Sequence, residues 1–230
     1  MANKNNFLII SDLHMPMQNH QAFRFLKQVK KDFDIPDSNC YCVGDETDQY
    51  NFGRWPKDPN ARHTAAQEIE RAIDAVKKLA AIFPELKICE SNHGSRIAAR
   101  AMDAMLPSEV LKGIKEVFKY PDGWQIEQNY IVMANKAEFC VMHGTGYSGA
   151  QGAVKAMWHN GISTCIGHIH GHAGVNYVKT NMQEMWAMNV GALYDPESYA
   201  FKYGKDHAQK GTLGCGVVLD GGKMAMWLPL

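Results

Sequence analysis

Three histidines lie within eight positions of the segment CIGHIHGH, residues 165–172. Gly167 and Gly171 stand among them, so a surface turn explains the cluster, and a single His-x-His pair favours that explanation. Neutral imidazole is, however, the commonest protein ligand for zinc, manganese and iron. His168 and His170 are two residues apart, so both side chains face one point if the backbone is extended. The rest of the chain must decide between a turn and a metal site.

Further potential metal ligands follow short apolar segments elsewhere in the chain. These segments and the residues after them are FLII (7–10) before Asp12 and His14, CYCV (40–43) before Asp45 and Asp48, LKIC (86–89) before Asn92 and His93, AEFCVM (137–142) before His143, and STCI (163–166) before His168 and His170. Loops at the carboxyl ends of strands in an open α/β sheet face a common crevice. If the five segments are strands, their loops therefore bring carboxylates, an amide and imidazoles to one place.

The donor atoms of this set indicate which ions it suits. A mixture of oxygen and nitrogen donors suits Mn²⁺, Fe or Zn²⁺ and is too rich in nitrogen for a Ca²⁺ or Mg²⁺ cage. The set also contains more ligands than one ion needs. Two ions that share a bridging carboxylate are the economical arrangement.

Taken together, five motifs identify a resemblance. DLH (12–14), GDETD (44–48), SNHG (91–94), VMHG (141–144) and GHIH (167–170) resemble the pattern DxH, GDxxD, GNH(D/E), H and GHxH of the calcineurin-like metallophosphoesterase superfamily. One such motif is weakly specific, but all five occur in the family's order, each after a strand-like segment. They span residues 12–170, about two-thirds of the chain. The compact size and the SNHGSR stretch are most similar to small bacteriophage-encoded members, some of which are nucleotide phosphatases.

The resemblance implies a fold and a set of ligands. The fold is a four-layer α/β/β/α sandwich of two mixed β-sheets, expected here as a single domain over residues 1–230. The metal ions are two divalent cations, with Mn²⁺ favoured and Fe, Zn²⁺, Co²⁺ or Ni²⁺ as alternatives. The implied ligands are Asp12, His14, Asp45 and His170 for one ion, and Asp45, Asn92, His143 and His168 for the other, with Asp45 bridging.

The resemblance also implies a reaction, in-line attack of a metal-bound hydroxide on a phosphate ester. His93 would be the general acid, with Asp48 hydrogen-bonded to its ring. Two divalent ions less two aspartates leave a formal surplus of about two positive charges, which matches a phosphomonoester dianion. The predicted function is therefore a phosphomonoesterase acting on a small substrate, with (deoxy)nucleoside 5′-monophosphates expected.

Two other functions stay open at this point. A phosphodiesterase or nuclease acting on a cyclic or short nucleotide diester would use the same metals. A catalytically inactive binding module is disfavoured, because such proteins usually lose ligands and every ligand position here is filled.

A few positions depart from the family pattern. Gln49 stands where the protein-phosphatase branch has a phosphate-contacting arginine, which disfavours a phosphoserine or phosphothreonine protein substrate. Ser91 and Gly94 replace a glycine and an acidic residue without removing a ligand. Arg96 and Arg100 lie one helical turn apart, so both could hold a phosphate, or both could simply be solvated.

A nucleotide substrate would also need a surface for its base. The aromatic candidates are Tyr147 in the rim loop 144–149, and Tyr194, Tyr199, Phe201 and Tyr203; ordinary packing explains each of them as well. His172 has no role in the family pattern. Helical faces carry Met102, Met105, Met157 and Trp158, which we expect in the core.

The elements that must position these residues follow from the apolar pattern. A capping box at Thr64 and Gln67 predicts a helix that ends before Pro84, and similar helices are expected over residues 19–33 and 150–160. After residue 171 the segments VNYV, QEMWAMNV, GCGVVLD and KMAMWLP predict antiparallel strands.

Composition limits the partners and the compartment. Lys plus Arg and Asp plus Glu number 24 each, and without a net positive charge we expect no strong binding to long nucleic acid. No run of about 18 apolar residues predicts a membrane span, and the first residues do not resemble a secretory signal. The six cysteines form no Cys-x-x-Cys pair and are expected to be buried reduced thiols. A cytoplasmic protein is predicted, in the host cytoplasm if a phage encodes it, while the oligomeric state is left open.

Overall fold

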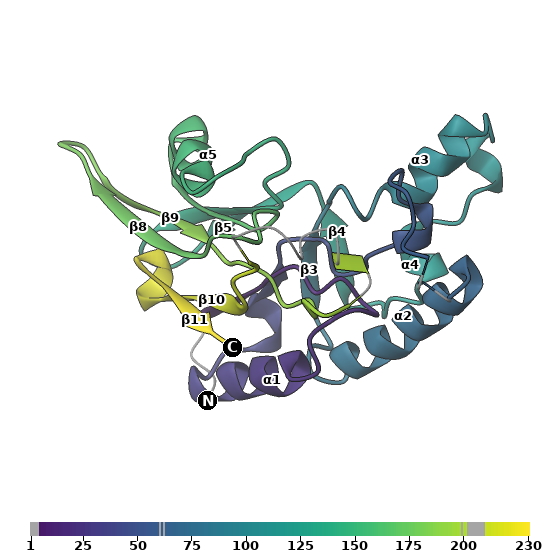
Figure 1. The fold of residues 1–230 in the computed structure, drawn as a ribbon. Coiled ribbons are helices and arrows are strands. Elements are labelled where there is room, and N and C mark those ends of the chain that lie inside the picture. The colour runs from purple at the N-terminus through teal and green to yellow at the C-terminus, as the bar shows by residue number, and fades with distance from the viewer. Residues whose placement is uncertain (1–4, 60, 62, 199, 202–209) are drawn as a thin grey trace.

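A computed structural model describes residues 5–59, 61, 63–198, 200–201 and 210–230 (Figure 1). Within these residues the chain is of mixed α/β type, with two mixed β-sheets and five α-helices. The helices are α1 (Ala22–Asp32), α2 (Ala65–Ala80), α3 (Arg96–Asp103), α4 (Ile114–Val117) and α5 (Gly152–Asn160).

The first sheet has six strands in the order β11-β10-β1-β2-β3-β4. Their bounds are β1 (Phe7–Ile10), β2 (Cys40–Cys42), β3 (Leu86–Cys89), β4 (Trp124–Glu127), β10 (Gly214–Leu219) and β11 (Met224–Pro229). The pairs from β1 to β4 are parallel, whereas β10 runs antiparallel to both β1 and β11. The carboxyl ends of β1, β2 and β3 therefore share one edge of the sheet.

The second sheet has five strands in the order β5-β6-β7-β9-β8. Their bounds are β5 (Asn129–Met133), β6 (Glu138–Met142), β7 (Ser163–Ile166), β8 (Gly174–Lys179) and β9 (Glu184–Asn189). β6, β7 and β9 are parallel, and β5 and β8 pair antiparallel at the two edges. The five strands expected before residue 171 are confirmed, and so are the later antiparallel pairs, while β4 and β5 were not predicted.

Helix boundaries follow local capping. The capping box is present: the Thr64 hydroxyl accepts from the Gln67 amide at 3.3 Å, and the Gln67 side chain accepts from the Thr64 amide at 2.9 Å. The helix expected from residue 19 begins at Ala22, because the Asn19 side chain accepts from the Gln21 amide in a turn before it. Gly161 ends α5 with a φ of 71°, in the left-handed region that favours glycine.

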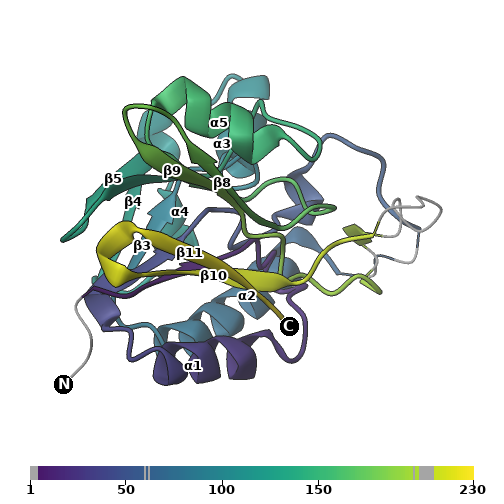
Figure 2. The ribbon, with the colours of Figure 1, turned by 90° about the vertical axis from the view of Figure 1, so that its left-hand side faces the viewer.

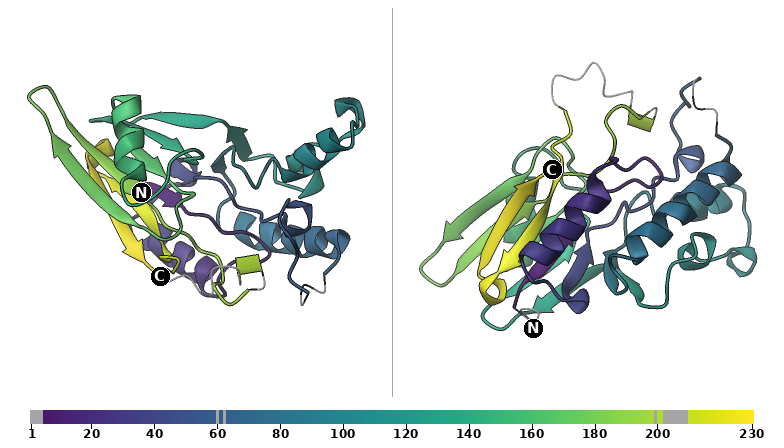
Figure 3. Two further views of the ribbon diagram at one scale, coloured as in Figure 1. Left: turned by 45° about the horizontal axis from the view of Figure 1, so that its top comes forward. Right: turned by 90° about the horizontal axis from the view of Figure 1, so that it is seen from below.

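Three clusters of buried apolar side chains separate four layers. Residues of α1 and α2, such as Leu26 and Leu79, pack on the first sheet. Phe139 and Trp186 of the second sheet pack between the two sheets against residues of the first. Met157 of α5 covers the outer face of the second sheet. Figure 2 shows α1 and α2 beneath the first sheet and α5 beyond the second, and Figure 3 shows α1 and α2 on the same face from below.

The expectation that four apolar helical residues lie in the core is wrong for three of them. Met157 is buried, but Met102, Met105 and Trp158 are exposed. Only Ala101 of α3 is buried, so this helix presents its neighbouring side chains to solvent. On α5, consecutive residues are rotated by roughly 100°, so Trp158 turns away from the sheet that Met157 faces.

Two expectations from composition can be compared with the fold. All six cysteines are free and buried, as predicted. In the described ranges, no helix combines the length and the apolar character that crossing a membrane requires.

We predict that Phe139 contributes strongly to stability through its packing between the two sheets. Its ring lies 5.3 Å from Phe7 and 5.4 Å from Trp186, measured between ring centroids, and it is fully buried. Phe139→Ala should lower the free energy of unfolding by about 3–5 kcal/mol in urea titrations followed by circular dichroism. Met182→Ala, at a residue 92% exposed, is the control and should change it by less than about 0.5 kcal/mol. Equal effects of the two substitutions would contradict the packing argument.

Candidate metal centre

The predicted ligands meet at one edge shared by the two sheets. Loops after β1, β2 and β3 belong to the first sheet, and loops after β6 and β7 belong to the second. Three groups of side chains place their ligand atoms within 4.8 Å of one another, and two of them match the predicted ligand sets: Asp12, His14, Asp45 and His170 form one, and Asp45, His143 and His168 form the other. The third group is His14, His93 and Asp48, the last two being the predicted acid and its partner. Each of the two ligand groups could hold a metal ion, and Asp45 is common to both.

The first ligand group has its donor atoms facing one another. His170 Nε2 lies 3.0 Å from Asp12 Oδ2 and 3.2 Å from His14 Nε2. His14 Nδ1 lies 2.7 Å from Asp48 Oδ1, where it donates a hydrogen bond. Because a neutral imidazole carries its proton on one nitrogen, this bond leaves the lone pair of His14 Nε2 directed at the group.

The second ligand group has the same design. His143 Nδ1 donates to the Val43 carbonyl at 2.9 Å, which directs Nε2 toward the ligand group. His143 Nε2 lies 3.4 Å from Asp45 Oδ2 and 2.8 Å from Asn92 Oδ1. Asn92 thus lies beside this group, as the motif pattern predicts.

Asp12 and Asp45 each use a carboxylate oxygen to accept a backbone amide while the carboxylate faces the other ligands. Asp12 Oδ2 accepts from the His168 amide at 2.8 Å, and Asp45 Oδ1 accepts from the His93 amide at 3.1 Å. Asp12 Oδ1 is buried and has no hydrogen-bond partner among the residues that the structure describes. A buried carboxylate oxygen without a donor is costly, and a cation at this position would satisfy it. The residues present therefore fit divalent cations.

Backbone conformation aims several of these side chains. His14, Asp45 and His168 have φ values of 51°, 47° and 66°, in the left-handed region that residues with a Cβ rarely adopt. The backbone amide of His14 donates to the Asp45 carbonyl at 2.8 Å, which holds the first two turns together. Such conformations cluster at functional sites, where the surrounding structure keeps them in place.

Glycine is required where the ligand loops approach one another at the site. A Cβ on Gly167, in the loop after β7, would lie 2.4 Å from Val43 Cγ2 and 2.5 Å from Asp12 Oδ1. Gly44 has a φ of 106°, and a Cβ there would lie 2.7 Å from Ser91 Cβ. Neither contact leaves room for a methyl group, so these glycines set the spacing between the ligand loops.

His93, the predicted general acid, lies beside both ligand groups. Its Nδ1 donates to the Asp48 carbonyl at 2.7 Å and lies 3.2 Å from Asp48 Oδ1. Its Nε2 lies 3.8 Å from Asp45 Oδ2 and accepts a hydrogen bond from Arg96 Nη2 at 2.7 Å. The Asp48 carboxylate is closer to His14 than to His93, so it orients a predicted metal ligand as well as the predicted acid.

Charge and burial determine how these groups ionise in the protein alone. Burial raises the pKa of Asp45, but His93, His143 and His14 outweigh it, and the pKa lies well below its usual value. Burial lowers the pKa of His93, yet Asp45 and Asp48 raise it overall. For His143, burial is outweighed by Asp45 and Asp12, and the pKa rises to about 9. Protons and metal ions therefore compete for the same imidazole nitrogens.

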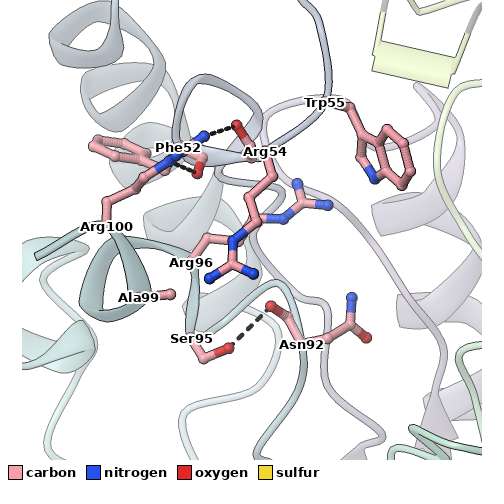
Figure 4. A pocket seen from close by; sticks show the side chains of 9 residues that line it. Phe52, Arg54, Trp55, Asn92, Ser95, Arg96, Ala99 and Arg100 are labelled. Atoms are coloured by element: carbon pink, nitrogen blue, oxygen red, sulfur yellow. Dashed lines mark hydrogen bonds between the residues drawn. The ribbon is translucent and has the colours of Figure 1, made fainter. Parts of the chain in front are cut away.

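The structure places the two predicted phosphate-binding arginines differently. Arg96 Nη1 donates to the Asp48 carbonyl at 2.8 Å, and its guanidinium lines the cavity beside the ligands. Arg100 Nε and Nη2 donate to the carbonyls of Phe52 and Gly53 at 2.9 and 2.6 Å. Arg100 therefore fixes the neighbouring loop and lines a second cavity with Arg96, as Figure 4 shows.

The aromatic candidates for base binding differ in their position. Tyr194 and Phe201 are buried and stacked, with ring centroids 4.0 Å apart, and pack against His14 and His170. Phe201 also lines the cavity beside the ligands. Tyr147 contacts His159 on α5, its hydroxyl 3.0 Å from Nδ1. Tyr199 and Tyr203 lie outside the described residues.

The loop between η2 (Tyr50–Phe52) and residue 59 contributes residues that sequence reasoning missed. Tyr50, Trp55 and Lys57 line a cavity of about 1080 Å³ together with His93 and the ligands Asp45, Asn92, His168 and His170. Trp55 is 81% exposed. The available signal was the segment FGRWPKDP, in which a tryptophan stands among glycine, proline and charged residues, outside any extended apolar pattern. His172 is half-buried and belongs to neither ligand group.

Neither a scan against protein-family models nor a search of curated proteins found a match. Any assignment of function therefore depends on the geometry of this site.

We predict that Asp45→Asn weakens metal binding at both ligand groups, because the substitution keeps the shape of the side chain and removes the charge that both groups share. Metal content is measured after incubation with Mn²⁺ and gel filtration, with two ions per chain expected for the unchanged protein. Asp12→Asn is the matched control, since Asp12 belongs to one group only and should cost one ion. Two tightly held ions in Asp45→Asn would overturn the bridging role.

Proposed function

We propose that this protein is a phosphohydrolase of the calcineurin-like metallophosphoesterase type, which binds two divalent metal ions, with Mn²⁺ favoured, and cleaves small phosphomonoesters. The observation that carries the proposal is the position of Asp45. Its Oδ2 atom lies 3.4 Å from His143 Nε2, 3.8 Å from His93 Nε2 and 3.9 Å from His14 Nε2. One carboxylate thus lies between two ligand groups and beside a possible proton donor.

The layer order supports the same family. Helices, first sheet, second sheet and helix follow one another, as in the α/β/β/α sandwich that the motifs imply. Ligands then reach the site from both sheets, in the order in which the family motifs occur along the chain.

Each of the two ligand groups would hold one ion. Asp12, His14, Asp45 and His170 would hold one, and Asp45, Asn92, His143 and His168 would hold the other. When bound, a pair of divalent ions activates water for attack on phosphorus and neutralises charge on the phosphate oxygens. The protein's own groups must orient the substrate and supply the proton that the leaving oxygen needs.

His93 is placed to supply that proton. The bond from Nδ1 to the Asp48 carbonyl fixes the ring, and Nε2 faces the cavity. Arg96 donates to Nε2 at 2.7 Å, so a phosphate that accepts hydrogen bonds from Arg96 would release this nitrogen. Nε2 can then carry a proton and transfer it to the leaving oxygen as the phosphorus–oxygen bond breaks.

The positive charge of the site favours a monoester as substrate, and the aromatic wall of the cavity favours a nucleotide. Arg96 lines the same cavity, but the Asp48 carboxylate 3.7 Å away offsets its charge, so the surplus of about two that two divalent ions leave after Asp12 and Asp45 remains. A doubly charged monoester satisfies more of this charge than a singly charged diester. Trp55, exposed at the wall of the 1080 Å³ cavity, offers a flat surface on which a base can stack.

We predict that monoesters are hydrolysed faster than diesters and that nucleoside 5′-monophosphates are among the best substrates. The test compares kcat/KM with Mn²⁺ for dAMP, dGMP, dCMP, dTMP, glycerol phosphate and bis-p-nitrophenyl phosphate. Trp55→Ala should lower kcat/KM for the nucleotides by about tenfold, and for glycerol phosphate by less than about twofold. If the diester is turned over faster than every nucleotide, the phosphodiesterase alternative replaces the monoesterase.

We predict that His93→Ala keeps its metal ions but loses turnover, by about 10²–10⁴-fold on glycerol phosphate, which is the usual contribution of a general acid. The backbone amide that bonds Asp45 is unchanged by this substitution, so metal content should be preserved. The loss should be much smaller for p-nitrophenyl phosphate, whose leaving group needs no proton. The same loss on both substrates would exclude the role of proton donor.

A further inference from the structure

A second cavity adjoins the cavity beside the metal ligands. It has a volume of about 260 Å³ and lies between the loop at residues 52–55 and the start of α3 (Figure 4). Gly53, Trp55, Asn92 and Arg96 line both cavities, so the two share a wall. The second cavity therefore lies directly beside the space next to the metal ligands.

The second cavity is positively charged. Arg54, Arg96 and Arg100 all line it, and none of its lining residues, which all belong to the described part of the chain, is acidic. Asp103 lies behind it, 3.4 Å from Arg54 and 3.7 Å from Arg100, and is shared between them. Asp48 Oδ2 lies 3.7 Å from Arg96 Nη1, so three arginines face two aspartates and a net positive charge remains. In Figure 4 the guanidinium groups of Arg54 and Arg96 point into the same space between Phe52 and Asn92. Like charges at close quarters repel unless an anion lies between them.

The loop that carries Arg54 is held in place by charged side chains. Both oxygens of the buried Glu68 carboxylate accept backbone amides, that of Tyr50 at 2.5 Å and that of Asn51 at 2.9 Å. Lys57 donates to the Gly53 carbonyl at 2.9 Å, next to the bonds from Arg100. The exposure of the Arg54 side chain, at 73%, is therefore set by an anchored backbone. Such anchoring lowers the entropy lost on binding a ligand.

The pKa of the nearby Lys57 reflects the same positive charges. Partial burial lowers the pKa of Lys57, and the charges of Arg96 and Arg100 lower it further. The field thus extends along the wall that the two cavities share.

We propose that the second cavity binds a second phosphate group of the substrate, held by Arg54 and by Arg96, which lines both cavities and can contact both phosphates, while Arg100 keeps the loop in place. This inference rests on the proposed function for the first phosphate. It narrows the substrate class to organic phosphates with two phosphate groups, either adjacent, as in a nucleoside 5′-diphosphate, or across the sugar, as in a nucleoside 3′,5′-bisphosphate. Guanidinium groups bind phosphate oxygens in pairs of parallel hydrogen bonds, which suits this role.

The test measures binding by calorimetry on the Mn²⁺-loaded full chain carrying His93→Ala, which slows turnover. The ligands are AMP, ADP and adenosine 3′,5′-bisphosphate. At least one of the two doubly phosphorylated ligands should bind about tenfold tighter than AMP. Adding Arg54→Ala should abolish that difference and change the Kd of AMP by less than about twofold. Arg24→Ala, at an exposed arginine on α1, is the matched control and should leave the difference intact.

Two outcomes would overturn the subsite: neither ligand binds tighter than AMP, or the difference survives Arg54→Ala. Because Arg54 is mostly exposed, its replacement should leave the melting temperature within about 2 °C of the parent. If the unmodified chain hydrolyses monophosphates while the difference is absent, the subsite is wrong and the phosphohydrolase stands. If the difference depends on Arg54 and no phosphate ester is hydrolysed, the phosphohydrolase is wrong and the subsite stands.

Discussion

The carboxylate of Asp45 is buried where the two sheets meet, and the surrounding residues stabilise its negative charge. A buried charge is tolerated only when hydrogen bonds and opposite charges surround it. One oxygen of Asp45 accepts a backbone amide, and the other faces imidazoles delivered by loops of both sheets. This requirement brings the ends of β1, β2, β3, β6 and β7 to a common edge, and it explains why polar residues occupy a position that is otherwise core.

The way the loops meet follows from sterics. Gly167 and Gly44 lie where a methyl group would collide with Asp12 and with Ser91, so the loops touch along the backbone. His14, Asp45 and His168 adopt left-handed conformations that turn their side chains out of the strand direction. Contact and backbone conformation together position the donor atoms before any ligand binds.

Much of this could be predicted from the sequence, since strand-like segments ending in His, Asp or Asn are local signals. The five early strands and the seven candidate ligands depend on such signals, and the structure brings those residues together. β4 was missed because polar residues interrupt its segment WQIE, whereas β5 contains the apolar run YIVM and could have been predicted. The direction of Arg100 was not predictable either, because carbonyls of a loop distant in sequence decide it. Trp55 lacked any periodic pattern that would have placed it at the site.

The division of each ligand group between two sheets has a thermodynamic consequence. Asp12, His14 and Asp45 belong to the first sheet, whereas His143, His168 and His170 belong to the second, and neither sheet alone presents a complete group. A cation bound by both stabilises only the docked sheets and has no equivalent site in the unfolded chain. If the proposed ions bind there, free metal concentration becomes a variable of the folding equilibrium. A chelator that removed them would then destabilise the apolar interface between the sheets, which assembles their ligands.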